Sequence, residues 1–269
     1  MSERIQKLLA AAGLGSRRGI ELWLRDGRIR VNGQVAGLGD RATANDRILL
    51  DGQPVDLGGL AQSAGGNPAG EILLYHKPVG EMTTRSDPQG RPTVFERLPR
   101  PVHGRWVVVG RLDVNTSGLL VFTTDGELAH RLMHPSYELR REYLVRVRGN
   151  PPKAALDSML RGLPLDDGLA RFDHLEATGQ SEGHSWFRVA LHEGRNREVR
   201  RLWEAAGYEV SRLKRIAYGP FLLPDDLPVC GTRLLSTAQV DDARRVIPDQ
   251  PATRDPPSAP PPQNTSNVR

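Results

Sequence analysis

A short polar loop between two apolar runs is the first place in this sequence where side chains could carry chemistry. The loop, residues 110–118, places Arg111 and Asp113 two positions apart, and Thr116 and Ser117 add hydroxyl groups. A loop fixed between buried strands is rigid and therefore suits a reacting carboxylate. An isolated aspartate is, however, also a common turn residue that satisfies local backbone groups. The flanking runs, each short and bounded by glycine or polar residues, are predicted strands at 106–109 and 119–122.

Two later segments offer further candidates. Tyr143 begins the apolar face of a predicted strand at 140–148, where a lone tyrosine is usually a plain core or rim aromatic. Arg200 lies on a predicted helix, about 100° from Val199 and so at the edge of the apolar stripe. A lone charge at that edge is costly, so Arg200 should have an acidic partner. Arg197 and Arg201 fall on the open side, which indicates either simple solubilisation or an anion bound across both.

Metal and nucleotide sites are not supported by the residue patterns. His130 and His134 are four apart on a predicted helix, but no carboxylate or thiol nearby completes a ligand set. No Walker spacing follows the turn at residues 78–80. We therefore expect neither a metal nor a cofactor.

Length and charge favour two domains and a polyanionic partner. The chain has 269 residues and a formal net charge of +5, and only four of its 37 basic residues are lysines. Arginine presents a planar fork that suits phosphates and stacks on bases. Cys230 is the only cysteine, so no internal disulfide is possible and a reducing cytoplasm fits. No apolar run is long enough to span a membrane, and no signal-peptide core follows Met1. We expect the protein to be a monomer.

The first 58 residues are predicted to form two helices and two hairpin turns. Ser2 is expected to cap the first helix and Ser16 the second, with Arg17 and Arg18 in the first turn of the second helix. Positive side chains at a helix N-terminus lower its stability slightly, so these arginines are reasonably explained by an anion that binds to them. The turn signals are Asn-Gly at 32–33 and Asp-Gly at 51–52.

Composition divides the remainder of the chain. Residues 59–70 are rich in glycine and small residues and are predicted to be a flexible linker. Residues 249–269 are rich in proline and are predicted to be disordered. Between them, residues 71–248 form the second predicted domain. Its expected elements are strands at 72–75 and 186–191, a short helical piece at 93–98, a helix capped by Asp125, a crossover helix at 152–160 closed by Gly162, and a helix capped by Asn196.

The N-terminal segment resembles the S4 RNA-binding domain. The matching stretches are residues 4–10, 15–18 and 27–33. The resemblance implies that basic side chains of this segment contact RNA phosphates, against the plain alternative of a solvated basic face. The implied RNA-binding residues are Arg4, Lys7, Arg17, Arg18, Arg28 and Arg30.

Three stretches of the second domain are similar to the motifs of S4-domain-containing ribosomal RNA pseudouridine synthases. They are residues 110–120, 141–143 and 193–202. The resemblance implies that Asp113 is catalytic, that Tyr143, Arg200, Arg111 and Leu112 bind the substrate, and that Arg197 and Arg201 bind RNA. It also implies an α+β fold, in which helices flank a mixed, mainly antiparallel central sheet and the cleft crosses that sheet.

The implied reaction detaches uracil from its sugar at N1, turns it, and rejoins it through C5, on a uridine of ribosomal RNA that we expect to lie in the 23S RNA of the large subunit. Asp113 would either attack the sugar or take a proton from C2′, and Arg200 would keep it ionised in a dry pocket. Tyr143 would stack on the uracil. The alternatives are an S4-type assembly factor without catalysis and a nucleoside hydrolase.

Overall fold

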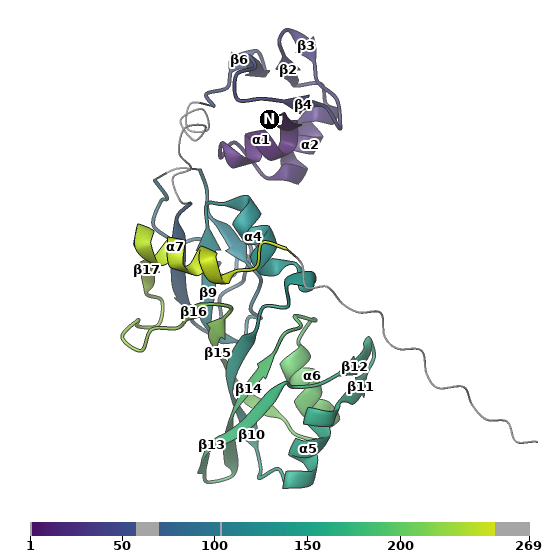
Figure 1. Ribbon diagram of the computed structural model, residues 1–269, viewed down its shortest axis with the longest axis vertical. Helices are drawn as coiled ribbons and strands as arrows, with labels where there is room; N and C mark the ends of the chain where they lie inside the picture. Colours follow the sequence, from purple (N-terminus) through teal and green to yellow (C-terminus); the bar gives the residue numbers. More distant parts are fainter. Residues whose placement is uncertain (1, 58–69, 103, 251–269) are drawn as a thin grey trace, which may run out of the picture.

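The computed structural model describes residues 2–57, 70–102 and 104–250 (Figure 1). The predicted linker, apart from residue 70, and the predicted tail, apart from residues 249 and 250, lie outside this range.

The N-terminal unit packs two helices against short strands, as the sequence predicts. Ser16 caps α2, because its Oγ accepts from the N–H of Gly19 at 2.9 Å. The predicted cap at Ser2 is wrong: the backbone at Arg4 is extended and pairs with another strand, so the first helix begins only at Ile5. The elements are β1 Glu3–Arg4, α1 Ile5–Ala11, α2 Arg17–Arg25, β2 Ile29–Val31, β3 Gln34–Val35, β4 Arg41–Ala42, β5 Ile48–Leu50 and β6 Gln53–Pro54.

Both predicted hairpin turns are present in this unit. Asn32 and Gly33 have φ of 50° and 88° between β2 and β3, and Asp51 and Gly52 have φ of 52° and 79° between β5 and β6. Positive φ at both central residues is the geometry that Asn-Gly and Asp-Gly favour. Local turn chemistry therefore fixes the register of this small sheet.

The larger unit is built on a nine-stranded sheet in the order β13-β14-β10-β15-β9-β7-β17, with β8 and β16 paired to β9 and β15. Every strand pair is antiparallel except β15 with β9, so the predicted mainly antiparallel α+β fold is confirmed. The strands are β7 Ile72–Lys77, β8 Val107–Val109, β9 Ser117–Thr123, β10 Arg141–Arg148, β13 His174–Ser181, β14 His184–Leu191, β15 Val210–Tyr218, β16 Phe221–Leu222 and β17 Thr232–Leu234.

Helices cover the sheet through two apolar cores. Figure 1 shows α4 and α7 beside β9, and α5 and α6 beside β10 and β14. Leu128 of α4 and Val240 of α7 pack with β7 and β9, while Met159 of α5 and Trp203 of α6 pack with β10 and β14. The remaining elements are α4 Gly126–Met133, a 3₁₀ turn at Pro135–Tyr137, α5 Lys153–Arg161, β11 Leu163–Leu165, β12 Gly168–Ala170, α6 Glu198–Ala205 and α7 Thr237–Val246.

Local signals located most of these elements, with two errors. Asp125 caps α4 and Gly162 ends α5, as predicted. Residues 93–98 are a turn and not a helix, because Thr93 is drawn into a bridge with Met82. Asn196 does not cap α6: the cap position is Arg197, whose φ is 50° and whose side chain makes no capping bond.

The two halves of the sheet meet at the parallel pair of β9 and β15. Gly118 of β9 lies opposite Arg215 of β15, and Arg215 in turn lies opposite Tyr143 of β10. A Cβ on Gly118 would lie 2.2 Å from the carbonyl oxygen of Arg215, and the φ of Gly118 is 107°, so only glycine fits. This close crossing is where the loop with Asp113 enters the sheet.

Candidate active site

One buried lysine holds the loop that carries Asp113 through hydrogen bonds to its backbone. Lys77, at the end of β7, has no exposed surface, and its Nζ donates to the carbonyls of Pro78, Asp113 and Thr116 at 2.9, 3.1 and 2.9 Å. Burial lowers the pKa of Lys77 to about 8, against the opposing pull of Glu81 and Asp113, so the ammonium form still dominates at neutral pH. Two of these bonds hold both ends of the turn from Asp113 to Thr116.

Further contacts complete the support of this loop. Thr83 Oγ1 donates to the carbonyl of Leu112 at 2.8 Å, and Arg200 Nη2 donates to the carbonyl of Asn115 at 2.8 Å. From β15, Arg215 Nε donates to the carbonyl of Leu119 at 2.9 Å. The backbone around Asp113 is therefore held by segments that are far apart in sequence, as expected of a site that must keep its geometry.

Asp113 opens into a cavity of about 590 Å³. Its side chain is 34% exposed, so it lies at the solvent edge of the cavity and not in the dry pocket that we expected. Tyr143, 9% exposed, lines the same cavity from β10, and Leu213 lines it from β15. A volume of this order holds a ligand of nucleoside size. The sequence-predicted residues that line it are Arg111, Leu112, Asp113, Tyr143 and Arg197.

The structure corrects the expected ion pair between Arg200 and Asp113. Arg200 is only 8% exposed, and its Nη atoms donate to backbone carbonyls, those of Asn115 and Val210, with no Asp113 oxygen within 4 Å. Burial lowers the Arg200 pKa, and Asp113 acts on it only as a nearby charge. The guanidinium within ion-pair distance is that of Arg197, whose Nη1 lies 4.0 Å from Asp113 Oδ2. Backbone carbonyls, which the sequence pattern does not reveal, accept from both Nη atoms of Arg200.

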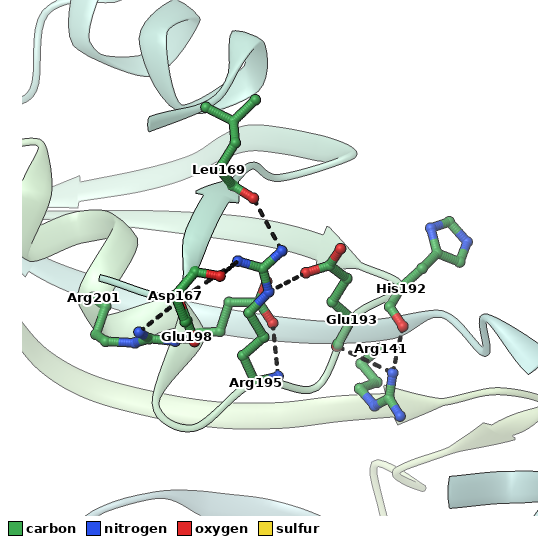
Figure 2. Close-up of polar contacts among 8 residues, drawn as sticks. All are labelled: Arg141, Asp167, Leu169, His192, Glu193, Arg195, Glu198 and Arg201. Atoms are coloured by element: carbon green, nitrogen blue, oxygen red, sulfur yellow. Dashed lines mark hydrogen bonds and ion pairs between the residues drawn. The ribbon is translucent and has the colours of Figure 1, made fainter. Parts of the chain in front are cut away.

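The loop before α6, residues 192–197, brings Arg197 to the cavity and is itself held from several sides (Figure 2). Arg141 Nη1 donates to the carbonyls of His192 and Glu193 at 2.6 and 3.1 Å. Arg195 lies between Glu193 and the β11–β12 hairpin, where its Nη2 donates to the carbonyl of Leu169 at 3.0 Å. The conformation of the loop is thus set by contacts with two other segments, β10 and the β11–β12 hairpin.

The remaining predicted RNA-binding residues differ in how free they are. Arg4, Arg17 and Arg18 are exposed and have no acidic partner within 4 Å among the described residues. Arg30 is exposed and donates to the carbonyl of Gly33. The others are paired: Lys7 with Glu3, Arg28 with Asp51, and Arg201 with Asp167.

Sequence reasoning missed Lys77, Thr83 and Arg215 as supports of the site. One signal was available for Lys77: it is the only lysine, arginine or acidic residue in the run 72–77, and Pro78 follows it directly. Nothing in the sequence marked Thr83, because its contact with Leu112 joins residues 29 positions apart.

No metal-binding group of three or more ligand residues occurs in the described part of the chain. The rings of His130 and His134 lie 5.1 Å apart, and His134 Nδ1 contacts Ser136 Oγ. Within the same described ranges, no helix has the length and apolar character needed to cross a membrane.

Comparison with known proteins gives two matching family models. A model described as RNA pseudouridylate synthase matches residues 71–205, and an S4 domain model matches residues 3–48. A solved structure described as a pseudouridylate synthase is similar with a TM-score of 0.60 and 22% identity, covering 89% of this chain and 99% of that chain. At that identity the likeness shows a shared fold.

Curated relatives named ribosomal large subunit pseudouridine synthase B are similar over most of the chain. The protein from Pseudomonas aeruginosa is 49% identical over 242 residues, which is 90% of this chain and 61% of the relative. The protein from Escherichia coli (strain K12) is 50% identical over 255 residues, which is 94% of this chain and 86% of the relative. The chain spans only 61%, 46% and 51% of the first three relatives, so these carry additional sequence.

Proposed function

The chain belongs to the RNA pseudouridylate synthase family, and we propose that it converts a uridine of ribosomal RNA into pseudouridine. The observation that carries the proposal is the cavity in which Asp113, Tyr143 and Arg197 meet from three separate segments. The names of the similar proteins favour the 23S RNA of the large subunit as the substrate. The proposal includes action as a monomer in the cytoplasm, without a cofactor.

Asp113 has the charge that the first bond cleavage needs. Breaking the N1–C1′ bond develops positive character at C1′, and an ionised carboxylate held beside C1′ lowers that barrier. The same carboxylate can add to the sugar or accept a proton from C2′, and both routes need it deprotonated. Arg197 Nη1, 4.0 Å from Asp113 Oδ2, puts a positive charge beside this carboxylate. The rigid carbonyl contacts of Lys77 would keep Asp113 in position while the base turns.

Tyr143 is our candidate for holding the detached uracil. It lines the cavity, where its aromatic ring would offer a surface on which a base can stack. After rotation, C5 of the uracil bonds to C1′, and the proton on C5 must leave. The Tyr143 hydroxyl is our candidate for helping to remove it. N1, which is no longer bonded to C1′, takes up a proton as C5 loses one, so the RNA gains and loses no atom overall and the product is an isomer.

RNA would reach this cavity with its target nucleotide turned out of the helix. A base paired within a helix is inaccessible to groups that line a cavity, and extruding it costs a few kcal/mol. Phosphate contacts can offset this cost. In our proposal the exposed Arg4, Arg17 and Arg18 provide them on the N-terminal unit.

The test is Asp113→Asn, a change that keeps the shape of the side chain and removes its charge. We expect pseudouridine formation on protein-free large-subunit RNA to fall by about a thousandfold or more, while RNA binding stays within twofold of the unaltered chain. Pseudouridine mapping in RNA from cells with and without this protein identifies the nucleotide.

Each alternative gives a different result. An assembly factor without catalysis leaves the pseudouridine map unchanged when the protein is removed. A nucleoside hydrolase releases free uracil, which chromatography of the reaction detects. Joint loss of binding and activity in Asp113→Asn would make Asp113 a structural residue and would overturn its catalytic assignment.

A further inference from the structure

Two glutamates meet in the wall of the cavity, and the proposed reaction does not use either of them. Glu198, the first residue of α6, is 4% exposed and lines the cavity. Its carboxyl group and that of Glu193 in the preceding loop share one neighbour, Arg195: Glu198 Oε2 accepts from the backbone N–H of Arg195 at 3.1 Å, and Glu193 Oε2 lies 2.5 Å from Arg195 Nε. Two carboxyl groups gathered around one residue repel each other when both are ionised, and a proton on one of them removes that repulsion.

We propose that Glu198 is a positioning residue, held neutral by a proton shared with Glu193, which shapes the loop before α6 so that Arg197 faces Asp113. The proposal deepens the proposed function and rests on it for its activity readout alone. Its structural readout is independent of any reaction.

The loop geometry connects Glu198 to Arg197. Glu198 Oε2 accepts from the backbone N–H of Arg195 at 3.1 Å, and the backbone N–H of Glu198 returns a bond to the carbonyl of Arg195. This closed turn contains Arg197 in the left-handed conformation, with φ of 50°, a conformation that costs energy for a residue other than glycine. Other contacts must therefore stabilise this turn, and the turn in return brings Arg197 close to Asp113.

A proton on Glu198 also satisfies a buried atom of Glu193. Glu193 Oε2 is buried and lies 2.5 Å from Arg195 Nε as an ion pair, but no N–H among the described residues is aligned with it as a hydrogen-bond donor. A protonated Glu198 carboxyl supplies that donor. With the proton in place, Glu198 accepts from Arg195 and donates to Glu193, so both glutamates are satisfied.

The charges of Arg195 and Arg201 act on Glu198, but each of these side chains is already paired with another carboxylate of the described residues. Arg195 is occupied by Glu193 and, at 3.5 Å, by Asp167 of the β11–β12 turn. Arg201, the next basic residue on this side of α6, is bound by both oxygens of Asp167 at 2.9 and 2.8 Å, with Asp166 close by (Figure 2).

Burial consequently raises the pKa of Glu198 to about 7; the backbone bond from Arg195 opposes the shift and the charge of Glu193 adds to it. The proton is therefore held at pH 6 and lost by pH 8. After its loss, two adjacent carboxylates repel each other inside the cavity wall, the turn loosens, and Arg197 withdraws from Asp113. The expected consequence is a decline of kcat above neutral pH that originates at Glu198.

Glu198→Gln tests the proposal, because glutamine keeps an acceptor for Arg195 and a donor for Glu193 but has no proton to lose. We expect kcat of the unaltered chain to fall by about fivefold more than that of Glu198→Gln between pH 6.5 and 8.5, with little change in KM. Glu198→Ala, which removes both bonds, should have a low kcat at every pH. Glu182→Gln, in the exposed β13–β14 turn, should follow the unaltered chain. Parallel profiles of the unaltered chain and Glu198→Gln would overturn the proposal.

The dependence of Tm on pH tests the same proposal without activity. Between pH 4.5 and about 7 the unfolded chain releases the Glu198 proton and the folded chain keeps it, so the stability of the folded state falls as pH rises. Glu198→Gln lacks this loss, so its Tm relative to the unaltered chain should rise by several degrees from pH 5 to pH 8. If the difference in Tm between Glu198→Gln and the unaltered chain is the same at every pH, the proposal about Glu198 is overturned. If the unaltered chain makes no pseudouridine, only the proposed function is overturned. If Glu198→Gln does not fold, Glu193→Gln should move the midpoint of the pH profile to lower pH, and an unmoved midpoint overturns the proposal.

Discussion

Arginine is used in opposite ways in the two parts of this chain. In the N-terminal unit, Arg4, Arg17 and Arg18 are exposed and have no acidic partner within 4 Å among the described residues. Around the cavity, Arg200 and Arg215 are buried and bind backbone carbonyls. The same guanidinium is a free charge in one region and a fixed structural support in the other.

The two sets of arginines therefore serve different purposes, the first affinity for RNA and the second the geometry of the loop with Asp113. Free surface cations attract a polyanion over a distance and are weakened by salt. Buried cations that donate to carbonyls do not reach RNA, but they set where the loop with Asp113 lies. We therefore expect changes in the N-terminal unit to affect binding and its salt dependence, and changes around the cavity to affect turnover or folding.

Among the basic residues, the largest effect should come from Lys77→Met, which keeps the length of the side chain and removes its three carbonyl contacts. Leaving buried carbonyls without a donor costs about 3 kcal/mol of folding stability. Turnover should fall by about a hundredfold or more, because Asp113 loses its support. Urea unfolding and single-turnover assays measure the two effects. Lys153→Met, at an exposed position, is the matched control. Unchanged turnover would refute the supporting role of Lys77.

Arg197→Ala should have a smaller effect that is confined to catalysis. The side chain is 43% exposed and contributes little to packing, so stability should change by less than about 1 kcal/mol. Loss of the charge 4.0 Å from Asp113 should lower kcat by about 10- to 100-fold. Arg148→Ala, on the exposed end of β10, is the control. If Arg197→Ala instead weakens RNA binding at constant kcat, Arg197 belongs with the free cations of the N-terminal unit.

The smallest effect on a single turnover should come from changing Arg17 and Arg18 together to alanine. We expect RNA affinity to fall by about tenfold at moderate salt and the slope of log affinity against log salt to decrease by between about 1 and 2. Single-turnover kcat at saturating RNA and the Tm should stay unchanged. Filter binding over a salt series measures the slope. A slope equal to that of the unaltered chain would remove these two arginines from the RNA interface.

Local patterns predicted a large part of the fold because the signals were local. The caps at Ser16 and Asp125 and the Asn-Gly turn after β2 each depend on a few neighbouring residues, and all are present. The cap at Ser2 failed because a strand partner 39 positions away competes for the same backbone.

The sequence predicted which residues belong to the site, but it did not predict which groups these residues contact. The loop with Asp113 was identifiable because apolar runs bracket it, and the helical angle of Arg200 indicated burial. Its partner was predicted wrongly, since an acidic residue is visible in a sequence and a backbone carbonyl is not. Lys77 escaped prediction for the same reason, because all three of its acceptors are carbonyl oxygens.

The close approach of β9 and β15 at Gly118 helps to set the distance between two parts of the cavity wall. Gly118, Arg215 and Tyr143 form one row across adjacent strands, and the first contact in that row is backbone against backbone. No side chain there can relax to absorb a change, so a single methyl group at position 118 would push apart the strands that carry the carboxylate loop and the aromatic ring. The distance between the loop with Asp113 and the ring of Tyr143 therefore depends on glycine at position 118.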